Sequence, residues 1–380
     1  MKQYLYILIV FIGWTTTVDG QLQDTLLFKG QASVWGHFNE DNPYPLYLGG
    51  RIIPQLNYEI QLPESRLIDF EVSYNGVGGV GINFGDSTDF NSKLSAYRVW
   101  GRYSTQQFEA RVGLQKINFG SASILRPLMW FDQVDPRDPL QLTDGVWAAL
   151  GRYYFMNNAN LWVWALYGNK NSKGWEIMKS NKTIPEVGGR FQSPVPAGEA
   201  ALSYHFRMAD SRDLQGVVPA YAEIPEHKIG LDARFDLEVG FWFEGAWIHQ
   251  GKDMATFTNQ EVLNVGVDYT FGIGNGLNAI VEHLLTSYDQ HAFSFDDPTQ
   301  FTALSMNYPF GLFDNINTII YYNWTDNQVY NFINWSKQYD HLTLNFMGYW
   351  NPDIYQMPLQ GGSENLFGGK GFQVMAVFNF

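Results

Sequence analysis

The sequence predicts an all-β fold, a transmembrane antiparallel β-barrel of about 18 strands, with about 16 as the alternative. The composition is the first indication, because aromatic residues (17%) outnumber charged residues (16%). Second, apolar and polar residues alternate in many short segments, and no segment after the N-terminus is apolar and long enough for a transmembrane helix. Third, the connections mostly alternate in length, which is typical of short periplasmic turns and long extracellular loops.

The first twenty residues predict a secretory signal peptide. Met1 and Lys2 precede the apolar run YLYILIVFIGW, and small and polar residues lead to Gly20. The run is too short to span a bilayer as a helix, so we expect cleavage after Gly20. The barrel is expected to occupy 21–380. Without a cysteine in the chain, we expect neither a lipid anchor nor disulfides.

The strands are predicted from their two-residue period. In RIIPQLNYEIQL, apolar residues from Ile52 to Leu62 share one face and polar residues from Arg51 to Gln61 share the other, with Ile53 as the misfit. LIDFEVSY, EAALSYHFR and IGLDARFD alternate in the same way. We expect the apolar face to meet lipid. The predicted strands are 28–38, 46–61, 67–75, 93–103, 107–116, 146–156, 159–168, 186–194, 198–207, 226–236, 238–249, 260–271, 276–286, 299–309, 315–325, 328–337, 339–350 and 370–380.

The last strand adds a more specific indication. GFQVMAVFNF puts Phe372, Val374, Ala376, Phe378 and Phe380 on the outward face. An alternating strand that ends on an aromatic residue resembles the C-terminal signal of Gram-negative outer-membrane proteins. The resemblance implies that the barrel-assembly machinery recognises Phe380 and inserts the chain into outer-membrane lipid. The expected location is therefore the outer membrane of a Gram-negative bacterium.

Charged residues on the predicted inward face indicate a hydrated lumen. A barrel this wide holds an aqueous channel, and arginine opposite carboxylate sets a field that acts on small hydrophilic solutes. The alternative is that these charges only pair with one another along the wall. The inward acids are Glu59, Asp69, Glu71, Glu109, Asp232, Asp236, Glu244 and Asp268. The inward arginines, expected to line the pore, are Arg51, Arg98, Arg102, Arg111, Arg152, Arg190, Arg207 and Arg234.

Several tryptophans also fall on the inward face. They are Trp35, Trp100, Trp162 and Trp164, together with Trp242. An aromatic track of this kind can stack on sugar rings. A register error of one residue would instead send all of them to the aromatic belt at the lipid interface.

The longest irregular segment, 117–145, predicts a constriction. Irregular backbone at membrane depth is tolerated where it is buried in protein or faces water, so a fold into the lumen is allowed. The alternative is a loop that covers the mouth. Met129, Trp130 and Phe131 supply bulk, and prolines at 127, 136 and 139 restrict the backbone. The charged residues expected to pair with the wall are Arg126, Asp132, Asp135, Arg137 and Asp138.

This region carries a family resemblance. GLQKINFG, RPLMWFDQVDPRDP and TDGVWAALGRYYF are similar to a segment of porin-like outer-membrane barrels, including those grouped with alginate-export channels. The matching positions are Gly113, Gln115, Ile117, Phe119 and Gly120, followed by Asp135-Pro136 and Asp138-Pro139. The resemblance implies a barrel type but no particular solute. The net charge of −14 departs from the strongly basic lumen of the alginate exporters.

Motifs for catalysis or cofactors are weak in this sequence. GVGGVG at 76–81 follows a strand but opens no helix, so it favours a bend near the rim over a nucleotide site. The seven histidines are scattered singly, and there is no G-x-S-x-G elbow. We therefore predict no enzyme, no catalytic residue, no metal and no cofactor. A Ser-His-acid set assembled across strands is the catalytic alternative left open.

The predicted function follows from the barrel and its lumen. We expect an outer-membrane channel, a porin, that gives passive or weakly selective diffusion of small hydrophilic solutes and is narrowed by an inward loop. The alternative is a structural or partner-binding barrel in an envelope machine for secretion or polysaccharide export. A homo-oligomer is compatible with either. The acidic balance argues against a nucleic-acid partner.

Overall fold

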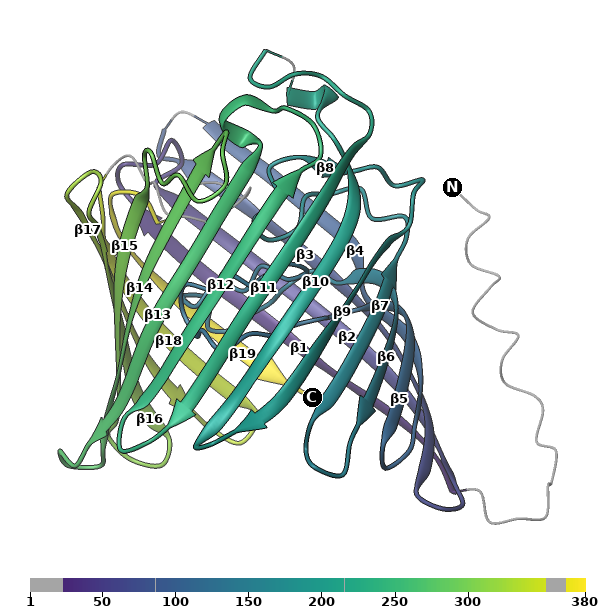
Figure 1. Ribbon diagram of the computed structural model, residues 1–380. Coiled ribbons are helices and arrows are strands. Elements are labelled where there is room, and N and C mark those ends of the chain that lie inside the picture. The colour runs from purple at the N-terminus through teal and green to yellow at the C-terminus, as the bar shows by residue number, and fades with distance from the viewer. Residues whose placement is uncertain (1–22, 86, 215, 353–366) are drawn as a thin grey trace, which may run out of the picture.

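The computed structural model describes residues 23–85, 87–214, 216–352 and 367–380, and the predicted signal peptide at 1–20 lies outside them. The described strands form one antiparallel sheet that closes on itself as a barrel (Figure 1). The sheet has 19 strands, of which the two-residue β8 only flanks β10, so that the other 18 make the wall. No helix among the described residues is both long and apolar enough to cross a membrane.

The predicted strands all occur, and most of their ends agree within a few residues. The main difference is that β3 continues to residue 83 and β4 begins at residue 87, so the glycines at 76–81 stay paired within β3. The pairing irregularity of β3 lies before them, between Ser73 and Tyr74. The strands are β1 (Gln23–Asn39), β2 (Leu46–Leu62), β3 (Arg66–Asn83), β4 (Ser87–Ser104), β5 (Phe108–Gln115), β6 (Val146–Tyr154), β7 (Asn160–Leu166), β8 (Lys179–Ser180), β9 (Glu186–Val195), β10 (Gly198–Asp210), β11 (Ile224–Asp236), β12 (Gly240–Gln250), β13 (Asn259–Phe271), β14 (Leu277–Asp289), β15 (Thr299–Pro309), β16 (Asp314–Asn323), β17 (Gln328–Gln338), β18 (Leu342–Trp350) and β19 (Lys370–Asn379). Two short 3₁₀ helices, Arg212–Leu214 and Ala255–Phe257, lie in connections.

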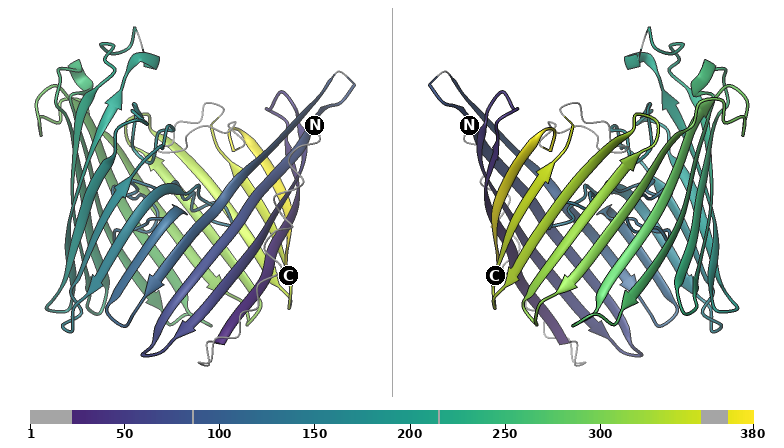
Figure 2. Two further views of the ribbon diagram at one scale, coloured as in Figure 1. Left: turned by 90° about the vertical axis from the view of Figure 1, so that its right-hand side faces the viewer. Right: turned by 90° about the vertical axis from the view of Figure 1, so that its left-hand side faces the viewer.

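The two ends of the barrel differ in their connections. One end, the short-turn end, carries tight links such as 63–65, 105–107 and 237–239. The other, the long-loop end, carries 116–145, 167–185, 211–223 and 351–369. The β3–β4 hairpin projects beyond the neighbouring wall at the long-loop end (Figure 2). This separation of short and long connections matches the sequence prediction.

The alternation of exposed apolar and buried polar side chains along each strand shows which face of the sheet points outward. On β3, Phe70 and Val72 are exposed, whereas Asp69 and Ser73, which flank this pair in the sequence, are buried. Because successive strand side chains point to opposite faces, the apolar set faces outward and the polar set faces the lumen. An outward apolar face around a polar interior is the arrangement of a transmembrane barrel.

The last strand closes the barrel by pairing with the first, and Phe380 extends this contact. β19 pairs with β18 and β1, and the backbone N–H of Phe380 donates to the carbonyl oxygen of Gly30 at 3.0 Å. Phe372, Phe378 and Phe380 are exposed on the outer face, as the sequence predicts. A Cβ at Gly30 would lie 2.4 Å from the Phe380 ring. The absence of a side chain at Gly30 therefore makes room for that ring.

We expect Gly30→Val to weaken closure of the barrel. The new side chain must displace the Phe380 ring, and its Cβ would also lie 2.9 Å from the Ile53 carbonyl oxygen, which the backbone holds in place. Overpacking of this kind costs about 1–3 kcal/mol. The measurement is the fraction of refolded chain that migrates as folded barrel on an unheated gel. Gly36→Val is the matched control, because a Cβ at Gly36 meets only the flexible Leu48 side chain, at 3.4 Å; equal folded fractions for the two variants would contradict the prediction.

Candidate functional site

The inner wall of β3–β6 carries a cluster of arginines around two acids. Arg102 donates two hydrogen bonds to the Asp69 carboxylate, both at 2.8 Å. Glu109 accepts from Arg111 at 3.0 Å and from Arg152 at 3.5 Å. All five side chains come from inward positions of neighbouring strands. Because the side chain of Arg102 keeps 26% of its surface exposed, this cluster still faces open lumen.

Aromatic rings hold several of these cations against the wall. Arg152 lies over the Trp162 ring, 3.9 Å from its centroid, and Arg111 lies over Trp100 at 4.8 Å. Farther along the wall, on β11 and β12, Arg234 lies over the Trp242 ring at 5.1 Å. The negative ring faces attract the guanidinium groups and limit their movement.

Arg190 and Arg234 also pair with acids, whereas two of the predicted arginines do not. Arg190 donates to both oxygens of Asp232, and Arg234 donates to Asp268 at 2.8 Å. Arg98 donates to the carbonyl oxygens of Tyr97 and Thr143, and no ion pair within the described part of the chain joins it or Arg51. Most of the arginines thus pair along the wall, which is the alternative that the sequence left open.

The 117–145 segment, between β5 and β6, is bound to the inner wall by two glutamates. Both lie at inward positions, Glu244 on β12 and Glu282 on β14. Seven strands, β6, β7 and β9–β13, separate β5 from β14 along the wall, so the segment crosses the lumen to reach them. Glu244 accepts hydrogen bonds from the backbone N–H groups of Ser121, Ala122 and Leu128, and Glu282 from those of Ser123, Ile124 and Leu125, at 2.6–3.1 Å.

Apolar side chains of this segment form a core inside the barrel. Leu128 and Trp130 are almost completely buried, and they lie over Gly230 of β11. Phe119 stacks on Trp164 with ring centroids 5.6 Å apart, and Phe131 contacts the same tryptophan edge-on. Part of the lumen is therefore filled with packed side chains.

The ion pairs described for the 117–145 segment join residues of the segment itself. Arg126 donates to Asp132 at 2.8 Å, and Arg137 donates to Asp135 at 2.7 Å. Asp138 accepts from the backbone N–H groups of Leu140 and Leu142. Local partners are reached at low entropic cost because only a few residues separate them. The described ion pairs of Arg126 and Arg137 are thus local, and pairing of this segment with wall charges stays a prediction.

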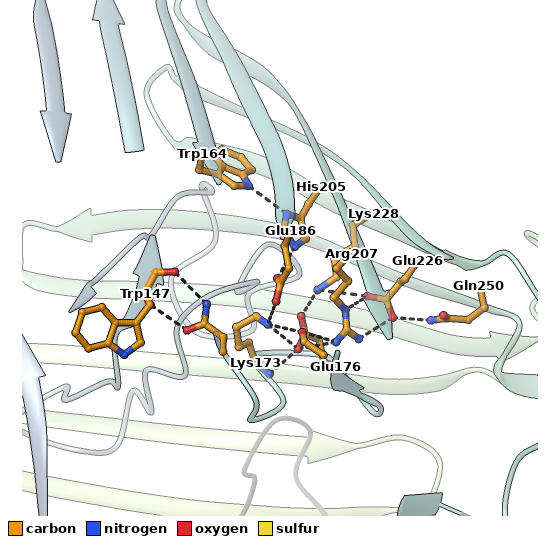
Figure 3. A network of polar contacts seen from close by, with 12 residues as sticks. Trp147, Trp164, Lys173, Glu176, Glu186, His205, Arg207, Glu226, Lys228 and Gln250 are labelled. Carbon is orange, nitrogen blue, oxygen red and sulfur yellow. Dashed lines mark hydrogen bonds and ion pairs between the residues drawn. The ribbon is translucent and has the colours of Figure 1, made fainter. Parts of the chain in front are cut away.

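A second segment, 167–185 between β7 and β9, also lies against the inner wall. Its Lys173 and Glu176 meet a charged patch on β9–β12 (Figure 3). Glu176 accepts from Lys228 at 2.7 Å and pairs with Arg207 at 3.2 Å. The wall members of this buried ion cluster are Glu186, His205, Arg207, Glu226, Lys228 and Gln250.

Sequence reasoning identified only Arg207 in this buried ion cluster. A signal for its wall partners was present, because Glu226 and Lys228 share the inward parity of Asp232 on β11. Lys173 and Glu176 lie in irregular chain, where no period indicates the direction of a side chain. The Trp175 indole N–H donates to the Arg126 carbonyl oxygen at 2.9 Å, which joins the two inner segments.

The predicted tryptophans point inward but do not form one continuous track. Trp164 is buried under the 117–145 segment, and its indole N–H donates to His205 at 3.1 Å. Trp162 lies between Arg152 and Phe119. Trp35 and Trp100 are partly exposed. No group of three or more metal-ligating side chains is found in the described part of the chain.

Comparisons with known proteins bear on the fold. No protein-family model matches the chain, and no curated protein matches it. Among solved structures it is similar to Acinetobacter baumannii OccAB1, with a TM-score of 0.56 and 8% identity over 94% of this chain and 96% of that one. It is also similar to the trimer form of OmpT, an outer membrane protein of Vibrio cholerae, with a TM-score of 0.50 and 11% identity over 94% and 99%. The chain therefore has the fold of porin-like outer-membrane barrels.

Proposed function

We propose that this protein is an outer-membrane channel through which small hydrophilic solutes diffuse, narrowed by the 117–145 segment. The observation that supports it is that the two inner segments bury much of the inner wall but leave inward charged side chains of β2–β6 partly exposed. The β9–β12 wall beneath them is closely covered, and Arg207 on it is inaccessible to solvent. The β2–β6 wall keeps partly exposed charged side chains such as Arg51 and Arg102.

The orientation of the channel follows from the lengths of its connections. The short-turn end would face the periplasm and the long-loop end the exterior. Phe380 then lies at the periplasmic end, where the barrel-assembly machinery would recognise it. The Gram-negative outer membrane is the location that this arrangement fits.

Solutes would pass along the β2–β6 wall by size exclusion and electrostatics. Its arginines and acids are nearly balanced, which favours weak ion selectivity over a strong preference for one sign. Covalent chemistry plays no part in such passage. A homo-oligomer of this chain is part of the proposal and is tested by crosslinking in native membranes.

The proposal is tested by single-channel recording of refolded protein in planar bilayers, where we expect steady, resolvable current. Arg111→Gln with Arg152→Gln should raise the cation-to-anion permeability ratio severalfold, because Glu109 loses two of its cationic partners. The reversal potential in a salt gradient measures this ratio. Arg212→Gln is the control, since Arg212 lies in the exposed connection after β10. Folded barrels that never conduct would contradict the channel.

A second candidate, a structural or partner-binding barrel in an envelope machine, has one observation in its favour. The apolar core around Trp130 and Phe131 occupies lumen that a wide diffusion channel would leave open. A scaffold can be closed without loss of its function. Absence of current from correctly folded barrels, together with capture of an envelope partner, would favour this candidate.

A further inference from the structure

Aromatic side chains lie against the inner wall of β1–β3 near the long-loop end. The Trp35 ring of β1 lies over Gly49 of β2, where a Cβ would be 2.3 Å from the ring. The Tyr47 side chain of β2 lies over Gly79 of β3 with the same clearance. Neither glycine could carry a side chain without moving these residues. The Trp35 ring and the hydroxyl end of Tyr47 are thus placed on backbone, and both side chains stay partly exposed.

The aromatic side chains of this region lie next to one another on the inner wall. Gly49 and Gly79 are direct partners in the β2–β3 pairing, so Trp35 and Tyr47 occupy adjacent strands about 4.8 Å apart. Tyr44, from the β1–β2 connection, lies over Gly81, two residues farther along β3. The three side chains therefore form one continuous row on the inner wall, which runs toward the long-loop end in the order Trp35, Tyr47 and Tyr44. We refer to these three side chains as the aromatic platform.

The platform differs from the other inward tryptophans in its exposure. Trp164 and Trp242 also lie against glycines, Gly188 and Gly266, but both tryptophans are buried. Trp164 is covered by the 117–145 segment, through Phe119 and Phe131. By contrast, the described residues leave Trp35, Tyr47 and Tyr44 partly exposed. Aromatic side chains that are positioned by backbone and stay partly exposed are suited to stacking on a solute.

Polar groups lie beside the platform. The Tyr47 hydroxyl donates to the Asn91 side-chain oxygen at 2.9 Å. The Arg51 guanidinium carbon lies over the Trp35 ring, 5.7 Å from its centroid, and the Arg51 side chain stays partly exposed. Lys93 shares the inward parity of Asn91 on β4 and is exposed. The platform is thus bordered by donors and acceptors, which a purely apolar ligand would leave unsatisfied.

The geometry points to a saccharide-binding site made by the aromatic platform with Arg51 and Asn91. A pyranose presents C–H groups on its faces and hydroxyls around its rim. The faces would stack on the negative ring faces, and the hydroxyls would bond to the guanidinium and amide groups. This inference rests on the proposed function, because it places the site on the path of the diffusing solutes. It also replaces the predicted Trp35–Trp100–Trp162–Trp164 track with a different set of rings.

Calorimetry on folded protein in detergent tests the site with maltohexaose and cellohexaose as probes. We expect measurable binding of at least one probe, weakened about tenfold by Trp35→Ala, which corresponds to about 1.4 kcal/mol. Tyr47→Ala should have a similar effect. Trp35→Phe keeps a ring and should retain most of the affinity, so it separates loss of stacking from loss of fold. Phe90→Ala is the control, because Phe90 is an exposed outward residue of β4.

Single-channel recording gives an independent readout. Brief interruptions of the current by the bound hexasaccharide are expected for wild type and should shorten in Trp35→Ala. A poly(ethylene glycol) of similar size, which has no rings, should cause none of comparable length. Equal affinity in wild type and both alanine variants, or no binding of either probe, would overturn the site. If the barrel conducts but binds neither probe, the saccharide site is wrong and the proposed channel stands. If the barrel binds a probe but never conducts, the proposed channel is wrong and the saccharide site stands.

Discussion

Glu282→Gln is expected to raise the conductance of the channel and to make it fluctuate. The carboxylate of Glu282 accepts three backbone N–H groups from Ser123, Ile124 and Leu125, and a fourth bond from Asn264. Successive N–H groups that converge on one anion form a concave anion site, here occupied by a side chain of the wall. A glutamine has one acceptor oxygen in place of two, and its amide N–H₂ would face donors.

The size of the effect follows from the charge on these hydrogen bonds. A hydrogen bond to a charged group contributes about 1.5–3 kcal/mol, and about 1.4 kcal/mol changes an equilibrium constant tenfold. Losing the equivalent of two such bonds would raise the undocked population of the segment by a factor of roughly 100 or more. Glu244→Gln should act in the same direction, because Gly120, at a φ of +108°, brings the backbone against that carboxylate.

Single-channel recording in planar bilayers measures both mean conductance and current noise. Glu59→Gln is the matched control: Glu59 is an inward glutamate on β2 with no hydrogen bond or ion pair to the 117–145 segment among the described contacts. Its conductance and noise should stay close to wild type. If Glu282→Gln and Glu244→Gln together behave like wild type, the two carboxylates do not hold the segment in place.

The strands could be predicted from the sequence, whereas the docking of the inner segments could not. A barrel wall repeats every two residues, so Ile52 or Phe70 shows its outward direction from its neighbours alone. The N–H groups of 123–125 belong to irregular backbone, and their acceptor Glu282 lies more than 150 residues away along the chain. The strand period shows that Glu282 points into the lumen. The neighbouring sequence does not show which group an inward carboxylate will contact.

The inward tryptophans show the same limit. Their direction follows from strand parity, and the structure places all of them on the lumen side. Whether a ring is open or covered depends on contacts from another part of the chain, as with Phe119 against Trp164. Tyr44 was not a candidate because it lies in a connection without a period. Its role beside Trp35 and Tyr47 depends on the glycines of a neighbouring strand.

The largest loss of stability is expected from Arg207→Met in the buried ion cluster. Arg207 donates to Glu226 through Nε and Nη2 and pairs with Glu176, and all three side chains are inaccessible or nearly so. Removing one partner of a buried charge network costs about 3–5 kcal/mol, because the remaining charge is left unpaired. Urea unfolding from lipid vesicles, followed by tryptophan fluorescence, measures the free energy of unfolding.

A second variant that restores charge balance shows whether the unpaired carboxylate causes the stability loss of Arg207→Met. Lys173, Arg207 and Lys228 neutralise Glu176, Glu186 and Glu226, so Arg207→Met leaves one excess negative charge. Adding Glu226→Gln restores neutrality and should recover a substantial part of the loss, although the packing of the guanidinium stays absent. Arg212→Met removes an exposed ion pair with Asp210 and should cost only about 0–1 kcal/mol. A double variant less stable than Arg207→Met would mean that lost packing and hydrogen bonds, and not the unpaired carboxylate, dominate the cost.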